Sequence, residues 1–196
     1  SSAAANGGSG GRAAGGAGGT TAASGSGGSG GAGGATATRT LTDAQIAAVT
    51  TVANSGEVDL GTLAVARAVL PAVRDFAQMM VTMHTAAQTR QSAVLATLGV
   101  QIAPNPISTQ LEADAMALRG QLTSASAAAF DRAYIQSQVD VHMRVLTTFD
   151  EQLLPNATAP ALRADLMLAR GEVAAHLALA RTLLATLDDL SDAGVP

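Results

Sequence analysis

Residues 71–99 are PAVRDFAQMMVTMHTAAQTRQSAVLATLG, and this segment establishes the helix as the main element of the chain. Its larger apolar residues recur at helical spacing, which places them on one face of a helix. Pro71 suits a first helical turn, and Gly99 suits a C-terminal cap. The segment therefore predicts a helix from 71 to about 98 whose buried face carries Val73, Phe76, Met80, Ala87 and Leu95.

The same period continues on both sides of this segment. Thr42-Asp43 can cap a helix that runs to about 68, and Ser108 can cap a short helix that closes near Gly120 and Ser124. Two long helices are predicted over about 127–153 and 161–189. The inward positions of these helices are Ile46, Val49, Ala53, Leu60, Ala64, Leu111, Ala115, Leu118, Leu122, Ile135, Val139, Leu146, Phe149, Leu153, Leu162, Leu166, Val173, Ala180, Leu183 and Leu187.

The connections between the helices predict their topology. Tight joints near 70 and near 157 would make two antiparallel hairpins, and the connection 99–126 is long, with a rigid Pro104-Asn105-Pro106 loop. Two hairpins joined by a long crossover are the ferritin-like arrangement. We therefore expect an all-α, ferritin-like four-helix bundle over residues 39–196, with a short extra helix in the crossover.

Residues 1–38 have a different composition and form a separate region. Most of the 21 glycines lie before Ala35, and the tract has no apolar side chain larger than Ala, so it cannot build a core. Two interpretations remain open. The tract is either a linker or an assembly arm whose exposed backbone pairs with other copies of the chain, giving a homo-oligomer or filament.

Polar side chains interrupt the apolar stripe of each long helix. They are Glu57, His84, His142 and His176, and each stands three or four residues from an apolar stripe position. Counting residues from the two tight joints places the members of each hairpin at similar depth. We expect the four side chains to meet in one layer of the core.

This layer has two interpretations. Glutamate and three histidines suit a single zinc, iron or copper ion, with Glu172, four residues before His176, as an outer ligand. The alternative is a metal-free polar layer that fixes the helix register. A di-iron centre needs Glu-x-x-His motifs, and the residues three before the histidines are Val81, Val139 and Val173.

Composition limits the function further. The net charge is −4 without a basic patch, which argues against a nucleic-acid partner. The absence of Cys excludes thiolate chemistry and disulfides, and the absence of Lys excludes Schiff bases. No apolar run is long enough for a membrane span. A Cys-free chain that starts at Ser1 with a Gly/Ser tract is typical of an exported bacterial protein.

Several segments of this chain together resemble one family of bacterial proteins, DUF4142. They are 53–61 (ANSGEVDLG), 73–81 (VRDFAQMMV), His84, 130–134 (FDRAY), His142, Phe149 and His176-Leu177. The resemblance covers about 41–188, leaves the Gly-rich tract outside, and implies a ferritin-like fold and export to the periplasm or cell surface. The family's usual Asp-His pair is Met83-His84 here.

Two functions follow as expectations. The first is an exported, non-enzymatic structural protein that assembles into an extracellular polymer through residues 1–38, since no catalytic constellation and no required cofactor are evident. The second is a periplasmic metal-binding or stress-related ferritin-like protein that uses Glu57, His84, His142 and His176.

Overall fold

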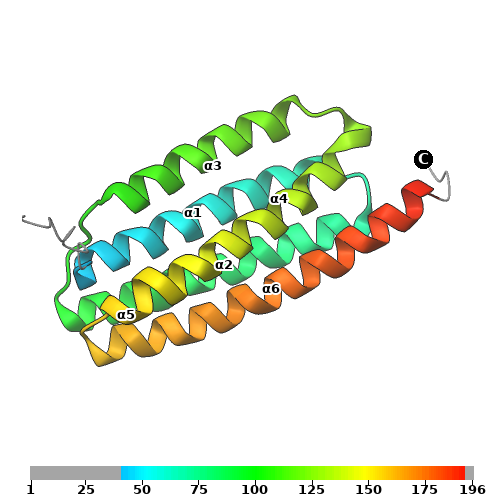
Figure 1. Cartoon of the computed structure of the whole chain (residues 1–196). Helices are drawn as coiled ribbons and strands as arrows, with labels where there is room; N and C mark the ends of the chain where they lie inside the picture. Colours follow the sequence, from blue (N-terminus) through cyan, green and yellow to red (C-terminus); the bar gives the residue numbers. More distant parts are fainter. Residues whose placement is uncertain (1–40, 193–196) are drawn as a thin grey trace, which may run out of the picture. The chain divides into compact units, whose positions relative to one another are not determined.

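The computed structural model describes residues 41–192, and the Gly-rich tract lies outside this range. Every regular element in the described range is helical, which confirms the predicted all-α class (Figure 1). The elements are α1 (Asp43–Arg67), α2 (Pro71–Leu98), α3 (Pro106–Ser124), α4 (Ala127–Thr148), the π-helical turn η1 (Phe149–Leu153), α5 (Leu154–Asn156) and α6 (Pro160–Asp192).

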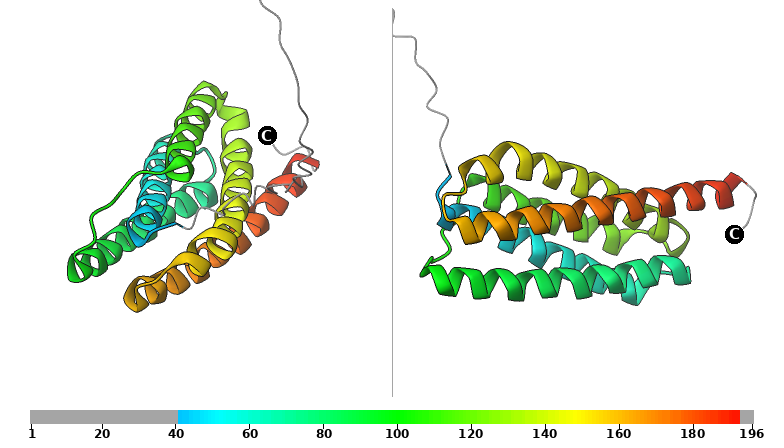
Figure 2. Two further views of the ribbon diagram at one scale, coloured as in Figure 1. Left: turned by 60° about the vertical axis from the view of Figure 1, so that its left-hand side comes forward. Right: turned by 90° about the horizontal axis from the view of Figure 1, so that it is seen from below.

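The four long helices form two antiparallel pairs. α1 packs mainly on α2 and α4 on α6, and α2 also contacts α6, so the two pairs share one core (Figures 1 and 2). α3 belongs to the long crossover and lies along α1, with few contacts to α4. A Cβ on Gly61 would lie 2.9 Å from Val81 Cγ2, so glycine permits the close approach of α1 and α2.

Local sequence signals explain where the first two helices begin and end. Thr42 caps α1 in a reciprocal capping box with Gln45, and Pro71 is the first residue of α2. Gly99 ends α2 with φ of 64°, a conformation that favours glycine. The buried Asp131 of α4 accepts hydrogen bonds from the backbone N–H groups of the α1–α2 joint, at 3.0 and 2.7 Å.

The start of α3 differs from the prediction. Asn105, not Ser108, is the N-cap, and its side chain accepts from the backbone N–H groups of Ile107 and Ser108. The Ser108 hydroxyl instead lies within hydrogen-bond distance of the backbone N–H of Asn105, completing the capping box. Pro106 opens the helix because a first-turn residue needs no N–H. Gly120 lies inside α3, which continues to Ser124.

The end of α4 also differs from the prediction. A single helix to about 153 is expected from the sequence, but α4 ends at Thr148 and continues as the wider turn η1. There the N–H of Leu154 donates to the carbonyl oxygen of Phe149, five residues earlier. Phe149 and Leu153 remain buried, so the inward stripe survives the change of helical pitch.

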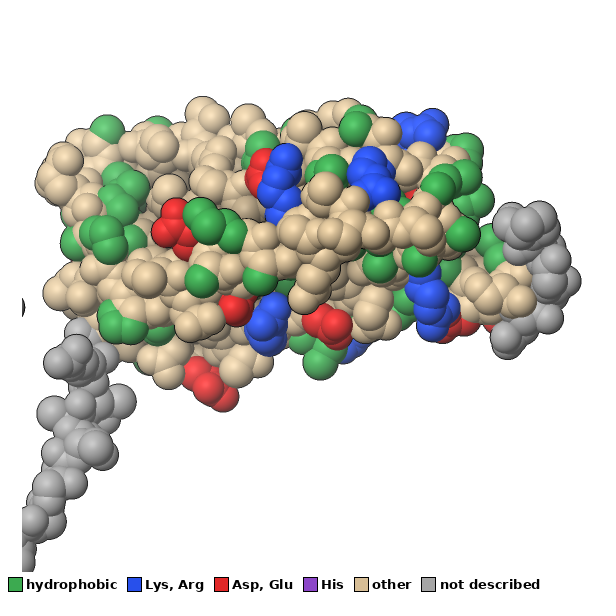
Figure 3. Space-filling model, turned by 90° about the horizontal axis from the view of Figure 1, so that it is seen from above, with side chains coloured by type: hydrophobic (Ala, Val, Ile, Leu, Met, Phe, Trp, Pro, Cys, Tyr) green, Lys and Arg blue, Asp and Glu red, His purple; other side chains and the backbone are tan. Residues whose placement is uncertain are grey.

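The apolar core is divided into two clusters. One cluster includes Phe76, Met80 and Tyr134 and lies toward the α1–α2 joint, and the other includes Ile46, Phe149 and Leu166 and lies toward the opposite end. The face seen in Figure 3 carries scattered acidic and basic side chains, some of them side by side, and shows no histidine among its described residues. None of the helices between residues 41 and 192 combines the length and apolar character that a membrane span requires.

Candidate metal centre

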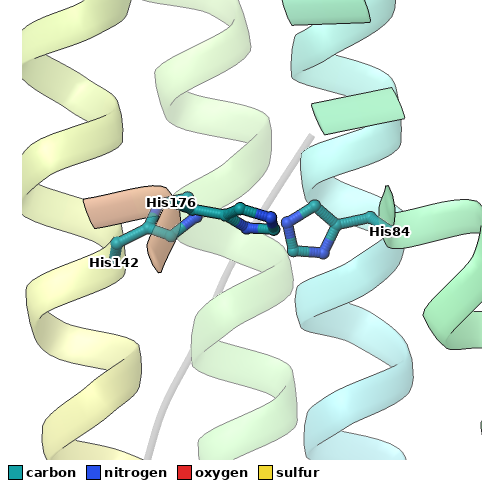
Figure 4. A group of neighbouring side chains, drawn as sticks. All are labelled: His84, His142 and His176. Atoms are coloured by element: carbon teal, nitrogen blue, oxygen red, sulfur yellow. The ribbon is translucent and has the colours of Figure 1, made fainter. Parts of the chain in front are cut away.

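Three imidazole rings meet between the two halves of the core. His84 from α2, His142 from α4 and His176 from α6 point toward one another (Figure 4). Their ring centroids are 5.2 to 6.1 Å apart. One nitrogen from each ring lies within 4.8 Å of one nitrogen of each of the others, and all three residues are buried. This arrangement offers three ligand atoms to one ion.

Hydrogen bonds on the far side of two rings fix which nitrogen faces inward. The Nδ1 atoms of His84 and His142 lie 2.8 Å from acceptor oxygens, the side-chain oxygen of Asn54 and the backbone carbonyl of Gln138. Each Nδ1 therefore carries the proton, and each Nε2 presents a lone pair. Such outer hydrogen bonds are typical of metal-binding histidines because they orient the ring.

Each ring has one buried nitrogen without a hydrogen bond to any described residue. These atoms are His84 Nε2, His142 Nε2 and His176 Nδ1. The rings therefore do not bond to one another. A buried polar atom without a partner costs about 1–3 kcal/mol, so a hydrogen-bond donor such as water, or a cation, would stabilise this position.

Burial also keeps the three rings neutral. Loss of solvation, together with repulsion from His176 and His142, lowers the pKa of His84 to about 3. Burial lowers the pKa of His142 to about 4, although its bond to Gln138 opposes this. Burial, together with His142, lowers the pKa of His176 to about 4. Neutral imidazole is the form that binds metal, so no proton competes at neutral pH.

Glu57 is buried in the same region but stands outside the group of three. No carboxylate of the described residues joins the set of ligand atoms within 4.8 Å. Glu57 lies near Gln138, and its Oε2 has no hydrogen-bond partner among the described residues. Burial raises the pKa of Glu57 to about 7, against the opposing effect of the neighbouring Gln138 amide. The structure therefore brings the three histidines together and places Glu57 beside them.

Glu172 interacts with a different partner. Both of its carboxylate oxygens accept from the guanidinium of Arg90, at 3.1 and 2.8 Å. Arg90 also donates to Asp165 at 2.6 Å, which ties α2 to α6. Glu172 lines the histidine cavity, and its charge opposes the fall in the pKa of His176. While Glu172 is paired with Arg90, it acts on the three histidines through its charge and not as a ligand atom.

A cavity of about 80 Å³ adjoins the three rings. It is partly open and lined mainly by apolar side chains of α1, α2, α3, α4 and α6, and Glu57 and the three histidines are in its wall. A single water needs roughly 10–15 Å³ measured in this way. The site therefore has room for an ion and for small molecules beside it.

Two supporting residues were missed in the sequence. Asn54 stands three positions before Glu57, and Gln138 stands four before His142, so both share the helix faces of the predicted site. A polar residue one turn from another inward polar residue, Glu57 or His142, is the signal that would have found them. The pairing of Arg90 with Glu172 has no such signal, because the two residues lie 82 positions apart.

Fold and site together define an all-helical protein with a buried three-histidine cluster. The model of one family, described as a domain of unknown function (DUF4142), matches residues 29–183, and the chain belongs to this family. The match begins at residue 29, upstream of the region that carries the resemblance and inside the Gly-rich tract. No curated protein and no solved structure matches the chain.

Proposed function

We propose that this protein binds a single transition-metal ion through His84, His142 and His176. The observation that carries the proposal is the convergence of three buried, neutral imidazoles, each with one buried nitrogen that lacks a protein partner. Imidazole ligands suit zinc, copper and iron. Three protein ligands leave at least one coordination position for another group, as in catalytic and transport sites rather than closed structural ones.

The proposal includes a ferritin-like bundle as the scaffold. Two antiparallel pairs, α1 with α2 and α4 with α6, are joined by a long crossover that contains α3, and this order supports the assignment. Each histidine comes from a different helix, so the rigid bundle sets the distances between the ligands. We further propose that the protein is exported, for which the support is the Gly/Ser-rich tract ahead of a Cys-free domain.

The test is metal analysis of the purified protein. The metal-free protein should take up one equivalent of zinc, copper or iron, measured by competition titration and elemental analysis. His142→Leu should remain folded and lose the ion, whereas Gln91→Leu, which replaces a buried polar residue away from the rings, should keep it. Uptake that is equal in both variants would show that the three rings do not form the site.

The structural role predicted for the Gly-rich tract remains a second proposal. Residues 1–38 lie outside the described part of the chain, so self-assembly into an extracellular polymer rests on the sequence alone. The two proposals are compatible, because one concerns the bundle and the other the segment that precedes it.

A further inference from the structure

The positive charge of an ion bound at the proposed site would have to be compensated by groups around it. A divalent ion held by three neutral rings would place two positive charges in a mostly apolar cavity, and an uncompensated buried charge is costly. Glu57 is the one buried carboxylate in the cavity wall among the described residues. Its ionised form would compensate one of the two charges and leave the other.

The remaining acidic groups of the wall are already engaged with arginines. Glu172 shares Arg90 with Asp165 in a group near the surface, where the side chains of Arg90 and Glu172 are 28% and 23% exposed. Asp114 of α3 faces Arg144 of α4 at 3.4 Å. The Arg90 group keeps one net negative charge, but its carboxylates are bound to the guanidinium and partly solvated. These groups therefore do not compensate the positive charge of the ion that Glu57 leaves over.

The cavity offers a route and a space for the missing anion. It extends from the rings to Leu111, Ala115 and Leu118 of α3, a helix with only Ser108 and Leu122 buried. Arg144 also lines it and is paired with Asp114, so the two side chains together add no net charge at the rim.

We propose that the metal-loaded site binds one small monovalent anion from solvent, such as a halide or a linear triatomic anion, in the cavity beneath α3. This inference rests on the proposed metal function and names the ligand class of that same site. The anion would supply the donor atom that the three histidines leave open. A volume of about 80 Å³ and walls with few hydrogen-bond donors disfavour tetrahedral polyanions.

The experiment uses the full chain loaded with Co²⁺, whose visible spectrum reports changes in its ligands. Azide should shift the spectrum and saturate at one azide per cobalt, whereas inorganic phosphate at the same concentration should leave the spectrum unchanged. A cobalt spectrum that azide does not change would overturn the anion proposal and leave the metal site intact. A spectrum that phosphate changes as readily as azide would also overturn it. Failure to bind cobalt, zinc, copper or iron alike would remove both proposals.

Two cavity-filling variants locate the anion. Ala53→Leu on α1 and Leu118→Trp on α3 each add bulk to the cavity wall, and both should weaken azide binding by about tenfold or more while keeping one cobalt per chain. Ala93→Leu, the same change at an exposed position of α2, should have no effect. If Ala53→Leu does not fold, Leu118→Trp alone decides. Unchanged azide affinity in the folded cavity variants would show that the anion does not occupy this cavity.

Discussion

The Nδ1–H of His84 donates a hydrogen bond of 2.8 Å to the side-chain oxygen of Asn54, across the interface between α2 and α1. This bond fixes the ring so that Nε2 faces His142 and His176. The orientation of one ligand on α2 therefore depends on a residue of α1 that would not itself touch the ion.

Removing this support should weaken metal binding without unfolding the protein. Asn54→Ala deletes the acceptor and frees the His84 ring, and loss of such an outer bond typically costs about 10–100-fold in metal affinity. Zinc competition titration measures the change. Ser55→Ala, next to it, removes only a contact with Gln88 and is the matched control. Equal affinity in the two variants would mean that the Asn54 bond does not position the ring.

The stability of the metal-free protein should fall on acidification from about pH 6.5 to pH 4. The folded-state pKa values of the three histidines are about 3 to 4, and the unfolded value is about 6.5. The unfolded chain therefore binds more protons in this window, which lowers the free energy of unfolding as pH falls. Glu57 acts in the opposite direction, but three groups outweigh one.

Denaturant titrations at several pH values, with a chelator present, measure this dependence. We expect a slope of about 1–3 kcal/mol per pH unit between pH 5 and 6. His176→Phe removes one of the three histidines, so the slope should fall by roughly the contribution of one protonating group. A stability that stays constant from pH 6.5 to 4 would show that the histidines are solvated and titrate normally.

Glu57→Gln should stabilise the metal-free protein, and the gain should grow with pH. Burial raises the folded pKa of Glu57 from 4.5 to about 7, so the stability that its protonated form provides below pH 4.5 is lost as pH rises through 7. Glutamine does not ionise and avoids this loss, which gives a gain of roughly 1–3 kcal/mol at pH 8. Thermal or chemical denaturation of both proteins at pH 4.5 and pH 8 measures this gain. An equal change in stability at the two pH values would contradict a raised pKa of Glu57.

Deleting residues 1–38 tests the proposed assembly role of the Gly-rich tract. The remaining chain should stay helical and unfold cooperatively, because the described core draws on residues from Leu41 onward. It should also lose the ability to form oligomers or filaments, which light scattering and electron microscopy would detect. An identical oligomer after deletion, or a monomeric full-length protein, would leave the tract as a spacer.

The sequence by itself determined the long helices, their order and most of the positions that they bury, although of the inward face predicted for α3 only Leu122 is buried. Helical period is a local property, so Val73, Phe76 and Met80 on one stripe predict a buried face without knowledge of its partner. Capping is local too, but several residues compete for one position, and Asn105 displaced Ser108 at the start of α3.

Only the tertiary structure decided how the polar side chains are used. The sequence placed Glu57, His84, His142 and His176 on inward faces, but helix rotation and side-chain rotamers set which atoms meet. The result is a group of three histidine nitrogens within 4.8 Å of one another that does not include the Glu57 carboxylate. The pairing of Glu172 with Arg90 likewise depends on how α2 and α6 pack. Such contacts between distant helices depend on packing that no local pattern encodes.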